Sequence, residues 1–249
     1  MSPPAAARGL AGRVSTFGNP EALAAAAAKR VVELSERNVR DHGHFAIALA
    51  GGETPKRLYE QLAGEPFRSQ IDWNAWRVYF GDERAVRPDS KHSNYRMARL
   101  SLLAHVPIAQ RHLHRMHAER DDLDAAAAEY STLLDTTVRH GGSGVPRLDL
   151  VLLGLGENGH CASLFPGTPA LEVTGAWATR GLADYAPFDR MTLTFPAINA
   201  ALNVMFLVSG ATKAQALAGV AAGTVPSSCV RPVEGSLQWY LDREAASLL

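Results

Sequence analysis

The chain is poor in cysteine and carries no excess of charge of either sign. Its 249 residues include 2 cysteines, and the separation of Cys161 and Cys229 does not match the ligand spacing of a zinc site. The 25 basic and 25 acidic side chains cancel, so no overall field draws the protein toward nucleic acid or an anionic membrane. We therefore expect no nucleic-acid partner, and any anion that the protein binds must be held by a local site.

Long apolar runs are also missing. No stretch approaches the roughly 20 consecutive apolar residues that span a bilayer. The N-terminal sequence MSPPAAARGLAGRV has no apolar core of the length found in secretory signals. With so few cysteines, these absences favour a reducing, cytoplasmic setting without a membrane partner. We expect a monomer or a weak homodimer.

What the chain does contain is an alternation of strand and helix patterns. Apolar runs predict strands over residues 44–49, 76–80, 112–116 and 148–153, and later in the segments MTLTF, VMFLVS and SLQWYL. Capping signals predict helices after Asn19-Pro20, Thr54-Pro55 and Ser93, and a helix over residues 121–140 that Gly141-Gly142 ends. This alternation predicts a three-layer, doubly wound α/β fold with a largely parallel sheet and helices on both faces.

No break in composition marks a second domain. We expect a flexible N-terminal tail over residues 1–13 and a single catalytic α/β domain over residues 14–249. The least regular stretch, residues 167–187, is predicted to form a flap or a rim loop. Ligands in open α/β sheets bind beyond the carboxyl ends of the strands, so the turns after the predicted strands are the candidates for chemistry.

The first such turn lies in the segment LDLVLLGLGENGHCASLFPG, residues 148–167. Its glycines fit the G-x-G-x-x-G spacing of a dinucleotide site, but Pro166 and Pro169 break any helix that would follow the third glycine. His160 is then the residue of interest, because a buried strand delivers a titratable imidazole to a glycine-rich turn. A core histidine that hydrogen-bonds to a backbone carbonyl is the alternative.

Two other chemistries are weighed at the histidines. Cys161 beside His160 suggests a thiol nucleophile with a base, but helical neighbours point about 100° apart and do not face each other. A metal site is the other possibility, for which the chain offers four further histidines, His105, His112, His114 and His117. No cysteine or carboxylate pair completes such a site, and we expect no metal.

Three further turns carry glycines and charged residues. The turn Gly51-Gly52-Glu53-Thr54 precedes a predicted helix, whose free N–H groups suit a phosphate, if Glu53 faces solvent or a cation. Asp82 and Arg84 follow the strand that ends at residue 80: Arg84 could grip a phosphate, and Asp82 could orient a sugar hydroxyl or accept its proton. Lys213 is predicted in the first turn of a helix, where a bound anion would offset its unfavourable interaction with the helix dipole. A tight turn, a solvated loop and a surface lysine are the respective alternatives.

Taken in order, these turns resemble the 6-phosphogluconolactonase family, within the wider group of sugar-phosphate isomerases and deaminases. The resemblance covers nearly the whole chain and rests on these segments: GGETP at 51–55, FGDERAV at 80–86, SNY at 93–95, LLGLGENGHCASLFPG at 152–167, RMTLT at 190–194 and SGATKAQAL at 209–217. It implies hydrolysis of 6-phosphoglucono-1,5-lactone, a sugar-phosphate substrate, in the oxidative pentose phosphate pathway without metal or organic cofactor.

The resemblance also implies roles for single residues. His160 is similar in position to the base that activates water, and Arg84 and Lys213 to phosphate ligands. We therefore predict that His160 and Asp82 are catalytic and that the substrate-binding residues are Gly51, Gly52, Thr54, Arg84, Asn158 and Lys213. The chain departs from the family at Asn158, Cys161 and Glu53, where aspartate, threonine and serine are common. The loss of a carboxylate at Asn158 puts in doubt its part in raising the pKa of His160.

Two alternatives stay open. A glucosamine-6-phosphate deaminase or isomerase would use Asp82 to abstract the C2 proton, although such deaminases usually continue from the histidine toward an asparagine-glutamate-proline segment where this chain has SLFPG. A sugar-phosphate sensor that keeps the pocket without turnover is the other alternative, and Asn158 is the one feature that suggests it.

Overall fold

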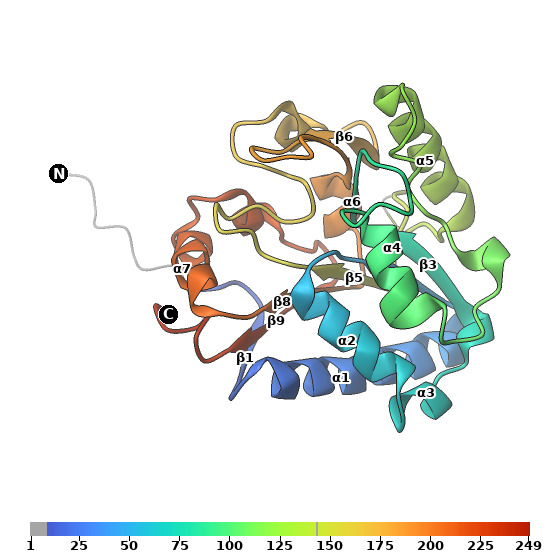
Figure 1. Ribbon diagram of the computed structural model, residues 1–249, viewed down its shortest axis with the longest axis horizontal. Helices are drawn as coiled ribbons and strands as arrows, with labels where there is room; N and C mark the ends of the chain where they lie inside the picture. The colour runs from blue at the N-terminus through green and yellow to red at the C-terminus, as the bar shows by residue number, and fades with distance from the viewer. Residues whose placement is uncertain (1–8, 143) are drawn as a thin grey trace.

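The centre of the molecule is a 6-stranded sheet in the order β1-β9-β8-β5-β2-β3, with every neighbouring pair parallel (Figure 1). This computed structural model describes residues 9–142 and 144–249, so residues 1–8 of the predicted tail lie outside the described residues. The strands are β1 (Arg13–Phe17), β2 (Phe45–Leu49), β3 (Trp76–Phe80), β5 (Leu150–Leu153), β8 (Asn203–Val208) and β9 (Ser236–Asp242). Helices flank the sheet, and the predicted fold class is confirmed.

The helices begin close to the predicted caps. They are α1 (Pro20–His42), α2 (Glu53–Ala63), α3 (Phe67–Gln70), α4 (Asn94–Ala98), α5 (Leu123–Thr137), α6 (Phe195–Asn199) and α7 (Ala214–Ala222). Asn19 caps α1 by accepting a hydrogen bond from the N–H of Ala22 at 2.8 Å, and Ser93 caps α4 in the same way. Two predicted boundaries are wrong: α2 starts at Glu53 with Gly52 as its cap, and α5 ends at Thr137, before the glycine pair.

A second, 3-stranded sheet stands beside the first and is antiparallel. It is formed by β4 (Asp82–Arg84), β7 (Asp189–Leu193) and β6 (Ala178–Leu182). The prediction that residues 81–92 begin as a polar loop is therefore wrong at β4, and the MTLTF segment lies in this sheet rather than in the parallel one. The stretch 167–187 contains β6 and a 3-10 turn, Pro169–Glu172, and its last residues lead into β7.

Both ends of the parallel sheet differ from the sequence-based expectation. The predicted strand 112–116 is absent: a 3-10 turn, Gln110–His112, leads to Leu113, which forms an isolated bridge to Val78. At the other edge, β1 begins at Arg13, the last residue of the predicted tail. Its five residues pair only with β9 and are partly exposed, so the segment lacks the apolar run that marks a buried strand.

The central strands of the parallel sheet are buried on both faces, which stabilises them through the hydrophobic effect. Every residue of β2 and β5 is buried, as expected for parallel strands covered by helices on either side. Because the strands run parallel, the turns after β2, β3, β5 and β8 meet at one edge of the sheet, where the site lies. Within the described part of the chain, no helix has the length and apolar content needed to cross a membrane.

Candidate active site

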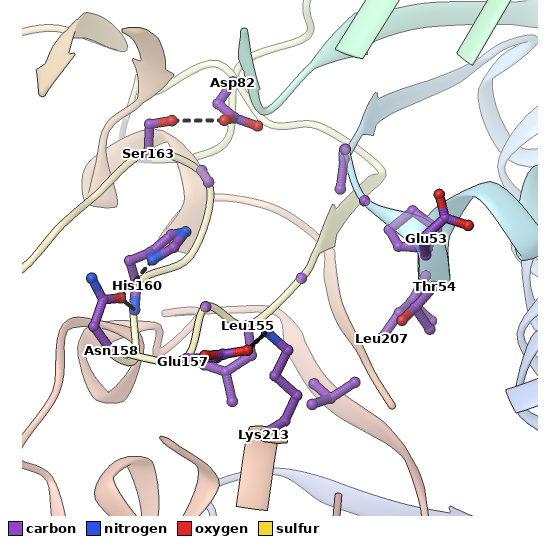
Figure 2. A pocket seen from close by; sticks show the side chains of 18 of the residues that line it. Glu53, Thr54, Asp82, Leu155, Glu157, Asn158, His160, Ser163, Leu207 and Lys213 are labelled. Carbon is purple, nitrogen blue, oxygen red and sulfur yellow. Dashed lines mark hydrogen bonds and ion pairs between the residues drawn. The ribbon is translucent and has the colours of Figure 1, made fainter. Parts of the chain in front are cut away.

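A cavity of about 640 Å³ opens at the carboxyl edge of the parallel sheet, between the turns after β2, β5 and β8 and the small sheet (Figure 2). The predicted site residues all line it: Gly51, Gly52, Thr54, Asp82, Arg84, Asn158, His160 and Lys213. Sequence reasoning missed four other polar residues that line the cavity, namely Ser163, Asp184, Tyr185 and Arg190. In Figure 2, His160 and Thr54 stand on opposite sides of the cavity.

The imidazole of His160 is held between a glycine and an aromatic ring. Phe165 stacks on it with ring centroids 3.9 Å apart and an angle of 21° between the planes. On Gly156, a Cβ atom would lie 2.0 Å from the ring atoms Nδ1 and Cε1, closer than atoms can approach. The imidazole can occupy this position only because residue 156 is a glycine. The turn is not followed by an α-helix, so the dinucleotide interpretation is not supported.

Asn158 determines which nitrogen of His160 carries the proton. The Nδ1 atom lies 2.6 Å from Asn158 Oδ1, which also accepts a bond from the His160 backbone N–H at 3.1 Å. An amide oxygen only accepts, so Nδ1 carries the hydrogen and Nε2 holds a lone pair. Within the described residues, Nε2 makes no hydrogen bond to the protein.

His160 is neutral at pH 7. Burial lowers its pKa to about 4, against the opposing charges of Asp82 and Asp184, which raise it, while Lys213 and Arg190 lower it further. A neutral imidazole with a lone pair on Nε2 is the form that can remove a proton from water.

Asp82 is buried and fixed by neutral donors. Its Oδ2 accepts a bond from the hydroxyl of Ser163 at 2.6 Å, and its Oδ1 accepts one from Asn94 Nδ2 at 3.0 Å. The side chain of Asn94 fills the space where Gly51 has no Cβ, since a Cβ atom there would lie 2.0 Å from Asn94 Oδ1. The glycine turn thus places the amide that orients Asp82.

Two arginines face the cavity from paired strands of the small sheet. Arg84 on β4 is the register partner of Arg190 on β7, so both side chains leave the same face of the pair. Arg190 is 1% exposed, and burial together with the charge of Arg84 lowers its pKa. Its Nη2 and the Nε of Arg84 are buried without a hydrogen-bond partner in the described residues. Like charges in register are unfavourable unless an anion lies between them, so this pair is a candidate anion site.

A second cationic group lies across the cavity, at the start of α2. Gly52 caps this helix without a side-chain hydrogen bond, so the first N–H groups are free to bind an anion. Thr54 Oγ1 lies 2.8 Å from the hydroxyl of Ser209, and Lys213 reaches the cavity in a 3-10 turn, with Nζ 3.8 Å from Glu157 Oε1 (Figure 2). Glu53 points to solvent with 79% of its side chain exposed, so its charge does not oppose an anion at this turn.

Cys161 takes no part in this chemistry. It is buried, and burial raises the pKa of its thiol to about 12, so it is protonated at pH 7. This supports the prediction that Cys161 and His160 do not form a nucleophile and base pair.

A histidine cluster lies away from the cavity and differs from the four histidines that the sequence suggested. The ligand atoms of His42, His44 and Asp149 lie within 4.8 Å of one another in the described chain. Arg139 Nη2 approaches His42 Nε2 to 3.1 Å and Asp149 Oδ1 to 3.6 Å. The guanidinium supplies the positive charge that a metal ion would bring, so this cluster is an ion-pair network.

The contact between Gly156 and His160 can be tested directly. We expect Gly156→Ala to lower kcat by about thirtyfold with the fold intact, because the added methyl group displaces the imidazole. Gly175→Ala is the matched control, since a Cβ atom there meets nothing within 4 Å. Steady-state kinetics of both variants decide the matter, and equal kcat values would show that the ring does not depend on this glycine.

A doubly wound sheet with a neutral histidine between two cationic groups at its carboxyl edge defines an enzyme for a small anionic substrate. The chain belongs to the family described as glucosamine-6-phosphate isomerases/6-phosphogluconolactonase, whose sequence profile matches residues 18–239. It is 39% identical over 245 residues to a 6-phosphogluconolactonase of Synechocystis sp., which covers 96% of this chain and 99% of that protein.

Solved structures agree with this assignment. The structure of 6-phosphogluconolactonase from Trypanosoma brucei matches with a TM-score of 0.85 and 32% identity, over 96% of this chain and 99% of that one. A monomeric glucosamine-6-phosphate deaminase matches with a TM-score of 0.79 over 95% of this chain and 100% of that one. At 23% identity, the deaminase shares the fold, and its activity is not thereby assigned.

Proposed function

We propose that the protein hydrolyses 6-phospho-D-glucono-1,5-lactone to 6-phospho-D-gluconate in the oxidative pentose phosphate pathway, in the cytoplasm, as a monomer or weak homodimer. The observation that carries this proposal is the neutral His160, whose Nε2 lone pair is free in a cavity with a cationic group on either side. A substrate with a phosphate at one end, which gains a carboxylate at the other, matches that distribution of charge. As the family resemblance implies, the reaction uses no metal or organic cofactor.

In the proposed mechanism His160 acts twice. Its Nε2 removes a proton from water while the water oxygen attacks C1 of the lactone, giving a tetrahedral oxyanion. The bond between C1 and the ring oxygen then breaks, and the imidazolium returns the proton to that oxygen, which becomes the C5 hydroxyl. The carboxylic acid formed at C1 releases its proton to solvent, and Arg84 and Arg190 stabilise first the oxyanion and then the carboxylate. Asp82, fixed by Ser163 and Asn94, orients the sugar by accepting from a hydroxyl.

The phosphate binds at the other end of the cavity. The free N–H groups at the start of α2, the hydroxyl of Thr54 and the ammonium of Lys213 together provide donors and positive charge. The family resemblance makes Arg84 a phosphate ligand as well, but its register with Arg190 favours the C1 end. Tyr185 lies between Arg190 and His160. The guanidinium carbon of Arg190 is 5.4 Å from the centroid of the Tyr185 ring, and the ring centroids of Tyr185 and His160 are 6.5 Å apart.

The test of the function is hydrolysis of the lactone above its spontaneous rate. We expect the protein to accelerate it and to release no ammonia from glucosamine 6-phosphate. Hydrolysis no faster than in buffer would refute the proposal. Ammonia release would then favour a deaminase, and tight binding of 6-phosphogluconate without turnover would favour a sensor.

The low pKa of His160 predicts how the free protein titrates. The pKa is depressed to about 4, so the neutral form, which is the base, should persist as the pH falls and be lost only near that value. We expect an NMR titration of the imidazole in the ligand-free protein to give a midpoint close to 4 rather than near the ordinary value of 6.5. A midpoint at or above 6.5 would show that burial does not control this group.

A further inference from the structure

We propose that Asp184 is a positioning residue, which fixes the amide of Asn158 and through it the tautomer that makes His160 a base. Asp184 lines the cavity from the connection between β6 and β7, and its Oδ2 accepts a hydrogen bond from Asn158 Nδ2 at 2.8 Å. On its other side, the same amide accepts from His160 Nδ1 at 2.6 Å. The catalytic part of this inference rests on the proposed function.

The two ends of an asparagine amide differ in chemistry, because the oxygen accepts hydrogen bonds and the nitrogen donates them. An asparagine can present either its oxygen or its nitrogen to a neighbour, and the two orientations have opposite effects on an imidazole. With the oxygen toward His160, Nδ1 carries the hydrogen and Nε2 is free to accept a proton from water. With the nitrogen toward His160, Nδ1 must accept, the hydrogen moves to Nε2, and the base is lost.

Two groups hold the productive orientation. The backbone N–H of His160 donates to Asn158 Oδ1 at 3.1 Å, and a rotated amide would place its nitrogen against this donor. The carboxylate of Asp184 accepts from Nδ2, and a rotated amide would place its oxygen against these oxygens. Both contacts penalise rotation, but only the contact with Asp184 comes from outside the turn. Asp184 is exposed and lies in the connection between β6 and β7 of the small sheet. This sheet and its connection therefore supply both the arginines and the group that orients Asn158.

The matched variants separate a hydrogen bond from a charge. Asp184→Ala removes the acceptor, and we expect kcat to fall about tenfold at unchanged KM, the lower end of the ten- to hundredfold loss seen when the partners that orient metal-ligating histidines are removed. Asp184→Asn removes the charge but keeps an oxygen that can accept from Asn158 Nδ2, and we expect it to stay within about threefold of the wild type. Equal losses in both variants would overturn the inference, because charge alone would then explain the effect.

Rescue at the neighbouring position gives the sharpest test. Adding Asn158→Asp to Asp184→Ala should restore kcat to within about threefold, because either oxygen of a carboxylate accepts from His160 Nδ1 and no orientation needs to be held. A residue that only stabilised the hairpin would not be rescued in this way. Asp189→Asn, which breaks the exposed ion pair of Asp189 with Arg180 on the same hairpin, is the control and should keep full activity. Failure of the double variant to recover would contradict the inference.

The tautomer can also be measured without turnover, which separates this inference from the proposed function. The imidazole ¹⁵N shifts of the wild type should report hydrogen on Nδ1, and those of Asp184→Ala a mixture of the two tautomers. Unchanged shifts in Asp184→Ala would overturn the inference even in an active lactonase. A wild type that fails to hydrolyse the lactone would refute the function, while the shifts would still decide the role of Asp184.

Discussion

Replacing His160 with glutamine should lower kcat for lactone hydrolysis by about a thousandfold and leave KM within a few-fold of the wild type. A positioned general base contributes on the order of 10²–10⁴ in rate, and the glutamine amide has no basic lone pair. Glutamine is chosen over alanine because it partly fills the space between Gly156 and Phe165 and so limits collapse of the turn. The residues proposed to bind the phosphate and the C1 end of the substrate are unchanged in this variant. Substrate binding, and with it KM, should therefore change little.

The measurement must correct for spontaneous hydrolysis, because the lactone opens without enzyme. His117→Gln is the matched control: this histidine is 57% exposed, lies 3.7 Å from Glu119 and does not line the cavity. We expect it to keep the activity of the wild type. If His160→Gln kept more than about a tenth of the wild-type kcat, the assignment of His160 as the base would be wrong, and Asp82 would be the next group to test.

The sequence predicts the parallel sheet and the turns that meet at its edge because both depend on local patterns. The buried run of β5, the caps of α1 and α4 and the glycines after β2 each leave a signal within a few residues. Once the strands are taken as parallel, topology alone places Thr54, Asp82, His160 and Lys213 in one cavity. This is why every predicted site residue lines it.

The missed features depend on contacts between segments far apart in the chain. Nothing local to Asp82–Arg84 shows that it pairs with Asp189–Leu193, and only that register places Arg190 opposite Arg84. A buried arginine in a strand-like segment, within RMTLT, is the signal that could have identified it. Asp184 gives no signal of its own, because its partner Asn158 lies 26 residues away across an irregular connection. The sequence thus indicates the proposed base, while the groups proposed to tune it are found only from the tertiary structure.

Arg190→Met should weaken binding of 6-phosphogluconate about a hundredfold, yet leave binding of sorbitol 6-phosphate within about threefold. The two ligands share the phosphate, but sorbitol 6-phosphate has a hydroxymethyl group where 6-phosphogluconate has its C1 carboxylate. Among the described residues, Arg190 Nη2 is buried and has no hydrogen-bond partner. A charge-assisted hydrogen bond to a carboxylate is worth about 1.5–3 kcal/mol, or roughly ten- to over a hundredfold in affinity. Methionine fills a similar volume without charge, and thermal unfolding verifies that the variant is folded.

Lys213→Met provides the opposite pattern, and the comparison assigns the two ends of the cavity. Lys213 lies at the start of α7, across the cavity from the arginine pair. Because both ligands carry the phosphate, loss of Lys213 should lower the affinity for each by a similar factor of about ten or more. Isothermal titration of the wild type and of both variants with each ligand at one ionic strength gives the six affinities that are needed. If Arg190→Met weakened sorbitol 6-phosphate as much as 6-phosphogluconate, the arginine pair would hold the phosphate, and the substrate would lie in the reverse direction. His160 would then have to reach C1 from the side of α2, which its stacking on Phe165 near Tyr185 disfavours.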